Sequence, residues 1–185
     1  MAAKSSLKNM ALCLTAVCLI CSSVLAGVYA LTFEPIKAAS QKAFEQSISA
    51  VLPEGLELSE AAVANQGGQT YEYYAASKDG ETEAYAVKST VIGFGGPLTL
   101  MVGILADGSV YNTSVLSHSE TPGLGAKCTS DAKFMEQWKG FPANANFSVK
   151  KDGGDVDAIT ASTITSRAYT LAVKNAVDVV KSLSK

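Results

Sequence analysis

Positive charge, histidine and cysteine are all scarce in this sequence. Its 15 Lys and Arg stand against 17 Asp and Glu, which gives a formal net charge of −2 and a pI of about 5.4. Proteins that bind nucleic acid usually present a basic patch, so we expect no nucleic-acid partner. The single histidine, His118, has no second histidine or cysteine near it, and we predict no metal site. Ser119 is adjacent to His118, but neighbours in an extended segment point to opposite faces, so no catalytic residue is predicted.

Cysteine is almost confined to one apolar stretch. Cys13, Cys18 and Cys21 lie inside it, and Cys128 is the one cysteine beyond it. One cysteine cannot form an intrachain disulfide within its own domain, so the sequence excludes a disulfide framework. The spacing of Cys18 and Cys21 matches half of a metal site, but without a second ligand pair it indicates ordinary apolar packing.

Charged residues are absent from residues 10–33. Roughly 24 helical residues at about 1.5 Å each extend about 36 Å, which exceeds the roughly 30 Å of bilayer hydrocarbon. Residues 10–33 are therefore predicted to form a transmembrane helix in contact with membrane lipid. Because this helix has no ionisable side chain of Asp, Glu, Lys or Arg, it has no evident group to carry an ion.

The orientation of this helix follows from the residues before it. Lys4 and Lys8 precede the apolar run, and no acidic residue does. The positive-inside rule then predicts a cytoplasmic N-terminus at residues 1–9 and places the rest on the periplasmic (extracytoplasmic) face of the cell inner membrane. A cleaved signal peptide is the alternative, since small residues near Ala26 resemble a cleavage site. Continuation of the run to Phe33 favours a retained single-pass anchor.

Residues 34–66 are predicted to link the anchor to a folded domain. Helical spacing of apolar residues continues from Glu34 to Leu52, with Pro35 in a first turn or at a kink. Turn residues at 53–55 end this helix. Residues 57–64 are ambiguous and indicate a short helix or a turn.

Strand patterns dominate from residue 67 onward. Two hairpins are expected, each with a short Asp-Gly turn. The predicted elements are strands at 70–75, 83–91, 98–105 and 110–116, a short helix at 131–139, a possible strand at 147–149, and a terminal helix at 162–183. Antiparallel strands in one block with flanking helices predict an α+β domain over residues 67–185.

The start of the terminal helix is rich in hydroxyl groups. Five Ser and Thr residues lie between residues 160 and 166, after Asp157. Such residues cap helix starts, and the N–H groups and dipole at a helix N-terminus favour a phosphate. From local chemistry alone, an elaborate helix cap is the simpler interpretation.

This stretch resembles the covalent flavin attachment motif of FMN-binding domains, in which an Asp is followed by a Ser/Thr-Gly-Ala-Thr core. In the alignment, the Asp of the motif is Asp157, its Ser/Thr is Thr160, and its flavin-bearing Thr is Thr163. Two residues depart from the pattern: Ala161 stands where Gly is usual and Ser162 where Ala is usual. Ala tolerates left-handed backbone angles less well than Gly, and Ser162 adds a competing hydroxyl.

A second stretch resembles the same family. Residues 95–108, together with the loop at 117–125 that contains Glu-Thr-Pro-Gly-Leu-Gly, are similar to the G subunit of Rnf ion-translocating ferredoxin:NAD oxidoreductases. The C subunit of the sodium-translocating NADH:quinone reductases shares the domain and is the nearer alternative. The loop and the threonine motif, in this order and spacing, are more specific together than either is alone.

The resemblance implies an electron-carrying subunit that is not catalytic alone. It also implies a flavoprotein in which FMN is bound covalently, through its phosphate, to Thr163, which makes the chain a phosphoprotein as well. It implies that Thr160 and Ser162 bind the phosphate and that the loop packs on the flavin ring through Glu120, Thr121, Gly123 and Leu124. Asp157 is assigned to recognition by a flavin transferase. The implied partners are that transferase and the membrane and peripheral subunits of an Rnf-type complex. Two other functions stay open: a membrane-anchored, flavin-free binding module, and a flavin-domain reductase that acts alone.

Overall fold

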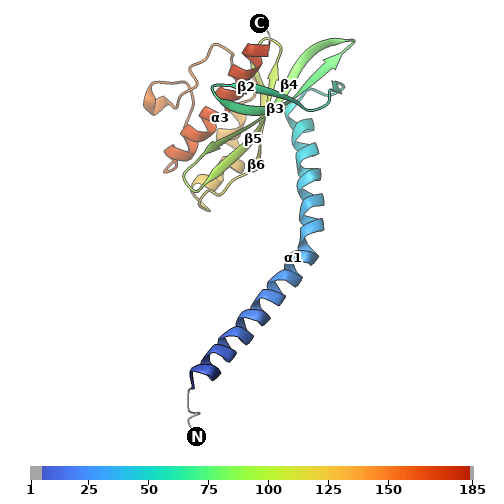
Figure 1. Cartoon of the computed structure of the whole chain (residues 1–185). Helices are drawn as coiled ribbons and strands as arrows, with labels where there is room; N and C mark the ends of the chain where they lie inside the picture. The colour runs from blue at the N-terminus through green and yellow to red at the C-terminus, as the bar shows by residue number, and fades with distance from the viewer. Residues whose placement is uncertain (1–5, 184–185) are drawn as a thin grey trace. The chain divides into compact units, whose positions relative to one another are not determined.

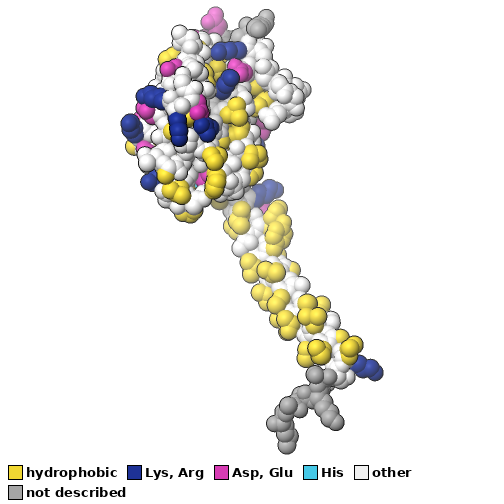
Figure 2. Space-filling model, turned by 90° about the vertical axis from the view of Figure 1, so that its left-hand side faces the viewer, with side chains coloured by type: hydrophobic (Ala, Val, Ile, Leu, Met, Phe, Trp, Pro, Cys, Tyr) yellow, Lys and Arg dark blue, Asp and Glu magenta, His cyan; other side chains and the backbone are white. Residues whose placement is uncertain are grey.

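The computed structural model describes residues 6–183 and divides the chain into two compact units, Met1–Ala43 and Phe44–Lys185. The first helix, α1 (Leu7–Val51), contributes to both units. Its first part is long and apolar enough to cross a membrane, and none of its most apolar window is buried. Hydrophobic side chains cover the visible surface of this part (Figure 2), as expected of a helix that faces lipid. Of the two lysines used for the orientation, Lys4 lies outside the described residues.

Pro35 lies inside α1 and does not begin a new helix. A proline within a helix removes one backbone hydrogen bond and kinks or breaks the helix; here the helix continues through it to Val51. Pro35 was predicted either in a first turn or at a kink, and its place inside α1 excludes the first turn, so residues 10–33 and 34–51 belong to one continuous helix. The compact unit that starts at Phe44 includes the end of this helix.

The second unit is built on a six-stranded antiparallel sheet (Figure 1). Its strands run in the order β1-β3-β4-β5-β6, and β2 also pairs with β3. Their bounds are β1 Glu57–Leu58, β2 Ala62–Gln66, β3 Gln69–Lys78, β4 Glu81–Ile92, β5 Pro97–Leu105 and β6 Val110–Ser117. Both predicted hairpins, β3–β4 and β5–β6, are confirmed. In the β3–β4 turn, Asp79 and Gly80 have the positive φ angles that a tight hairpin turn requires.

Two local predictions are wrong. Residues 57–64 are not a helix or a turn alone, because they contain β1 and the start of β2, which pair with the two ends of β3. The partner of β1 lies far along the chain, which no local pattern shows. The partner of β2 follows directly after the Gly67-Gly68 turn, a local hairpin signal that the prediction missed. Residues 147–149 are not a strand: Val149 forms an isolated bridge with Val156, and the short 3-10 helix η2 (Lys150–Asp152) follows directly.

The remaining helices follow the sheet in the chain. The 3-10 helix η1 (Gly125–Thr129) was not predicted, whereas α2 (Ala132–Glu136) and α3 (Thr163–Leu183) confirm the expected helices. Asp131 caps α2, since its side chain accepts a hydrogen bond from the Phe134 N–H at 3.2 Å. Thr163 is the first residue of α3, which places the hydroxyl cluster at a helix N-terminus as predicted.

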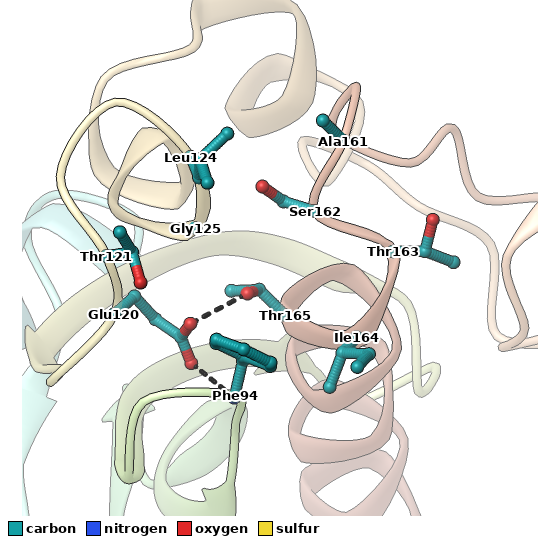
Figure 3. Close-up of a pocket in the computed structure, with 10 residues that line it drawn as sticks. All are labelled: Phe94, Glu120, Thr121, Leu124, Gly125, Ala161, Ser162, Thr163, Ile164 and Thr165. Carbon is teal, nitrogen blue, oxygen red and sulfur yellow. Dashed lines mark hydrogen bonds between the residues drawn. The ribbon is translucent and has the colours of Figure 1, made fainter.

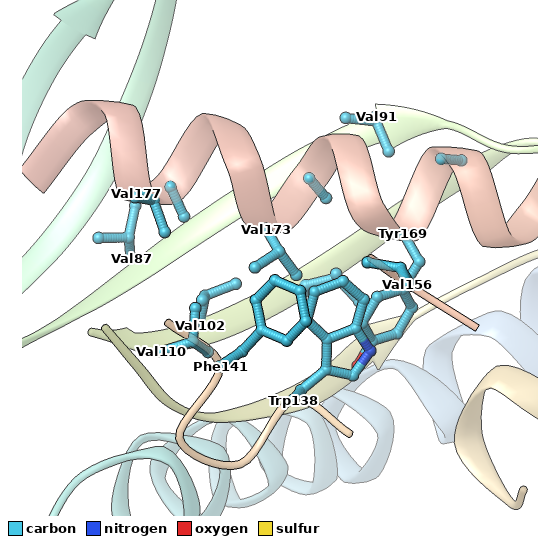
Figure 4. Close-up of a cluster of buried hydrophobic side chains, with 14 of the residues drawn as sticks. Val87, Val91, Val102, Val110, Trp138, Phe141, Val156, Tyr169, Val173 and Val177 are labelled. Atoms are coloured by element: carbon cyan, nitrogen blue, oxygen red, sulfur yellow. The ribbon is translucent and has the colours of Figure 1, made fainter. Parts of the chain in front are cut away.

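The sheet has an apolar layer on each face. Alternate residues of β4 separate the two layers, because successive side chains of a strand point to opposite faces. Val87 and Val91 belong to the large core that includes the buried face of α3, and Ala84 and Ala86 belong to a smaller cluster with the end of α1. In the large core, Trp138 stacks on Tyr169 with ring centroids 5.5 Å apart (Figure 4). This packing fixes α3, and therefore its N-terminus, against the sheet.

Gly103 lets the end of α1 approach β5 closely. A Cβ at this position would overlap the backbone carbonyl of Val51. We expect Gly103→Ala to lower the free energy of unfolding of the domain by about 2 kcal/mol or more, because backbone cannot move aside cheaply. Thermal unfolding of the chain in detergent, followed by fluorescence of the single Trp138, measures the effect. Gly27→Ala is the control, since nothing lies within 4 Å of the added carbon; equal melting of both variants would contradict the prediction.

Candidate functional site

The two stretches that carry the family resemblance line one cavity. It has a volume of about 340 Å³, within the range of small-molecule sites. One wall comes from the loop after β6, the opposite wall from the start of α3, and the floor from the β4–β5 loop (Figure 3). The lining residues are Phe94, Glu120, Thr121, Leu124, Gly125, Ala161, Ser162, Thr163, Ile164 and Thr165.

Glu120 joins the three segments. Its side chain is only 5% exposed, and its Oε1 accepts a hydrogen bond from the Phe94 N–H at 2.8 Å. Its Oε2 accepts one from the Thr165 hydroxyl at 2.8 Å. Hydrogen bonds to a buried carboxylate are stronger than those between neutral groups. One side chain therefore holds the β4–β5 loop, the loop after β6 and α3 in a fixed arrangement.

Glycines make this arrangement possible. A Cβ on Gly93 or on Gly125 would overlap the carboxylate of Glu120, and a Cβ on Gly95 would overlap the Ser119 carbonyl. Glycine is therefore needed at these positions of the β4–β5 loop and of the loop after β6, because the backbone there passes close to Glu120 or Ser119.

Ala161 has a left-handed backbone, with φ of 61°. It stands at the motif position where Gly is usual, and the structure shows why: the chain must turn there before α3 begins. A non-glycine residue in this conformation costs roughly 1–2 kcal/mol. Ala in place of Gly at this position therefore carries backbone strain.

We expect Ala161→Gly to stabilise the domain by about 0.5–1 kcal/mol, because relief of the left-handed strain exceeds the extra chain entropy of Gly. Chemical unfolding measures this change. Ala158→Gly is the matched control: Ala158 is exposed in the same segment but has no positive φ, so Gly there should stabilise nothing. A loss of stability in Ala161→Gly would contradict the assignment of backbone strain to Ala161.

The hydroxyl groups near the start of α3 differ in environment. Thr165 is 2% exposed and bonded to Glu120, and Ser166 is fully buried and bonded to the Ser162 carbonyl. Thr160 is exposed but does not line the cavity. Thr163 is half-buried and lines it.

Ser162 lines the cavity and is 7% exposed, yet its hydroxyl has no hydrogen-bond partner among residues 6–183. It stands immediately before α3, where Ser usually bonds an N–H of the first turn. Instead its oxygen points across the cavity toward Leu124 and Gly125, while the Thr163 hydroxyl points in another direction (Figure 3).

The predicted site residues are brought together in part. Five of them line the cavity: Glu120, Thr121, Leu124, Ser162 and Thr163. Gly123 and Thr160 do not. The sequence reasoning missed Phe94 and Ile164, which supply apolar lining. The glycines around Phe94 were the available signal, because an exposed aromatic residue in a loop shaped by close contacts often serves binding.

Asp157 lies outside the cavity lining. Its carboxylate pairs with Lys150 Nζ at 3.0 Å and its side chain is 45% exposed. The Lys150 hydrogen bond lowers the pKa of Asp157 below its usual value, so the group is ionised at neutral pH. An exposed, charged residue beside the motif is accessible to another protein.

His118 and Cys128 flank the cavity-forming loop. The Nδ1 of His118 accepts a hydrogen bond from the Glu120 N–H at 3.2 Å, which gives the histidine a structural contact. Burial raises the pKa of the Cys128 thiol to about 11, so this thiol stays protonated and unreactive at neutral pH. Within residues 6–183, no group of three His, Cys, Asp or Glu side chains is placed to hold a metal ion.

Residues 93–178 match the model of the FMN-binding domain family. The chain is 42% identical over 99 residues to the G subunit of the proton-translocating ferredoxin:NAD(+) oxidoreductase complex of Clostridium ljungdahlii, an alignment that covers 52% of this chain and 53% of that protein. It is 44% identical over 90 residues to the G subunit of the ion-translocating oxidoreductase complex of Shewanella baltica, covering 46% of this chain and 42% of that protein. These matches confirm the resemblance predicted from the sequence.

The chain thus spans about half the length of the curated relatives it matches. Among solved structures, it is similar to the C subunit of the Na(+)-translocating NADH-quinone reductase of Parabacteroides distasonis, with 26% identity and a TM-score of 0.49, over 70% of this chain and 75% of that chain.

Proposed function

We propose that the chain is the electron-transfer subunit of a membrane-bound, ion-translocating ferredoxin:NAD oxidoreductase and that it carries FMN bound covalently through its phosphate to Thr163. The supporting observation is that residues 161–163 of the threonine motif and the loop at residues 120–125, which lies 36 or more positions earlier in the sequence, form opposite walls of one cavity. The match of residues 93–178 to FMN-binding domains supports the choice of ligand.

The residues present fit FMN. The side chains of Phe94, Leu124 and Ile164 are between 44% and 67% exposed, and they offer apolar surface to a flat aromatic ring. The N-terminus of α3 offers N–H groups without intrahelical partners and the positive end of a 21-residue helix dipole. A phosphate is stabilised in such a place.

Thr163 is the best acceptor among the described hydroxyls from 160 to 166. A separate transferase has to reach the oxygen, which argues against the buried Ser162, Thr165 and Ser166. The acceptor must also adjoin the cavity, which argues against Thr160. Thr163 meets both requirements, and Asp157, exposed and ionised nearby, is available for recognition by the transferase.

FMN supplies transfer of one or two electrons when it is bound. The chain's own part is to hold the ring between the loop after β6 and α3, to keep that arrangement rigid through Glu120, and to keep the phosphate at the helix N-terminus. A covalently held cofactor cannot diffuse away between its redox states.

The membrane and partner assignments are part of this proposal. The apolar helix anchors the chain, with residues 1–9 in the cytoplasm and the FMN domain on the extracytoplasmic face. Ion movement belongs to other subunits, because residues 10–33 contain no Asp, Glu, Lys or Arg. The G-subunit relatives support an Rnf-type complex over the alternative, the C subunit of the NADH:quinone reductases.

Production of the full chain with and without a flavin transferase tests the proposal. We expect a yellow protein whose flavin fluorescence stays with the polypeptide band in a denaturing gel, and only when the transferase is present. A colourless protein under both conditions would indicate a flavin-free binding module. Turnover with a soluble electron donor in the absence of other subunits would indicate a reductase that acts alone.

A further inference from the structure

The Ser162 hydroxyl is the polar group of the cavity whose position is least explained by the protein itself. It is 7% exposed and has no hydrogen-bond partner within residues 6–183. Buried hydroxyls in folded proteins nearly always have a partner, and an exception calls for a ligand or a functional reason. Its neighbours Thr165 and Ser166 follow this rule, since each donates a hydrogen bond.

Capping of α3 does not explain Ser162. A serine before the first helical residue normally turns its oxygen back to an N–H of the first turn. Here the oxygen points into the cavity, toward the loop that contains Leu124 and Gly125, and away from the direction of the Thr163 hydroxyl (Figure 3). The phosphate on Thr163, as proposed above, would therefore lie in a different direction from the Ser162 oxygen.

We propose that Ser162 is a flavin-binding residue whose hydroxyl hydrogen-bonds a polar edge of the isoalloxazine ring inside the cavity. The side chains of Phe94, Leu124 and Ile164 offer apolar contact only, and both Glu120 oxygens already accept a hydrogen bond. Ser162 is thus the side chain in the cavity lining with a buried, unused hydrogen-bonding atom. This inference rests on the proposed function, and it changes the predicted role of Ser162 from the phosphate to the ring.

The inference predicts opposite effects of Ser162→Ala on the two forms of the chain. Without flavin, the substitution removes a buried hydroxyl that lacks a partner, so the melting temperature stays the same or rises by about 2 °C. With flavin attached, it removes a hydrogen bond, so the melting temperature falls by about 2–5 °C relative to the flavin-loaded wild type. Alanine fits the backbone, since Ala is usual at this position of the motif.

The experiment uses the full chain in detergent, produced with or without the transferase and melted while the fluorescence of Trp138 is followed. Ser166→Ala is the matched control: that hydroxyl bonds the Ile159 N–H and the Ser162 carbonyl, so its loss should lower both forms alike. The flavin-loaded Ser162→Ala chain should also show a shifted visible absorption maximum, which a helix cap would not produce.

Two results overturn the inference. Equal loss of stability in both forms of Ser162→Ala would make Ser162 a structural residue, and an unchanged flavin-loaded form would show that the hydroxyl does not contact the ring. The intact mass of each preparation is measured first. If the wild type carries no FMN, the proposed function is wrong, and the inference fails with it. If the wild type carries FMN and Ser162→Ala gives either of the two melting results above, only the inference is wrong.

Discussion

Substitution of Thr163 by valine is expected to abolish covalent flavin completely. Valine has nearly the shape of threonine but no hydroxyl, so the helix and the cavity are kept while the proposed ester oxygen is lost. Thr163 is the first residue of α3 and is only half-buried, so a valine of the same size fits at this position. Fluorescence of the denatured polypeptide band, after production with the transferase, gives the readout.

Two matched variants show whether the loss is specific. Thr160→Val removes an exposed hydroxyl outside the cavity lining, and Thr165→Val removes the hydroxyl bonded to Glu120. Both should keep covalent flavin, the second with lower stability, since Glu120 loses a partner. Fluorescence that survives in Thr163→Val and disappears in one of the others would move the attachment to that residue.

Substitution of Glu120 by alanine is expected to destabilise the domain by about 3 kcal/mol. It leaves the Phe94 N–H and the Thr165 hydroxyl without their acceptor and opens a space at the centre of the site. The β4–β5 loop loses its connection to α3, so the flavin environment should change as well. Thermal unfolding in detergent measures the first effect, and visible absorption of the flavin-loaded chain measures the second.

Glu136 is the control for this substitution. It is exposed on α2, and its loss should change the stability by no more than about 0.5 kcal/mol. The stability of Glu120→Gln should lie between those of Glu120→Ala and Glu136→Ala, because the amide keeps one oxygen acceptor and turns its NH₂ group toward the other donor. An unfolding midpoint of Glu120→Ala equal to that of Glu136→Ala would contradict the central place of Glu120.

Local chemistry was sufficient to predict the elements that position the site. The Asp-Gly turns identified both hairpins, and apolar spacing identified α3 within one residue of its observed start at Thr163. These signals depend on neighbouring residues alone, and tertiary contacts agree with them. For β1 the decisive contacts are with the far end of β3, farther along the chain, and no local pattern contained them. For β2 a local signal existed and was missed, because β2 and β3 form a hairpin across the two-residue turn Gly67-Gly68, whose φ angles are both positive.

The site was predictable by residue type and only partly by geometry. The motif indicated a helix N-terminus with hydroxyl groups, and the structure confirms that position. The sequence could not show that Glu120 bonds Thr165, 45 positions away, or that Phe94 lies in the same cavity, because both depend on how two loops meet α3. It also could not distinguish the buried Ser162 from the half-buried Thr163.

The two departures from the motif have different consequences. Ala161 keeps the left-handed backbone that Gly would adopt without strain, so it affects stability more than chemistry. Ser162 adds a hydroxyl inside the cavity where the motif usually has a methyl group, so it affects what the cavity binds.

The intact mass of the denatured chain, produced together with its flavin transferase, shows whether flavin is attached to the polypeptide. We expect the mass of the polypeptide plus one FMN minus one water, and fragmentation should place the added mass on Thr163. A mass equal to that of the amino acids alone would contradict covalent attachment, and with it the function proposed for this cavity.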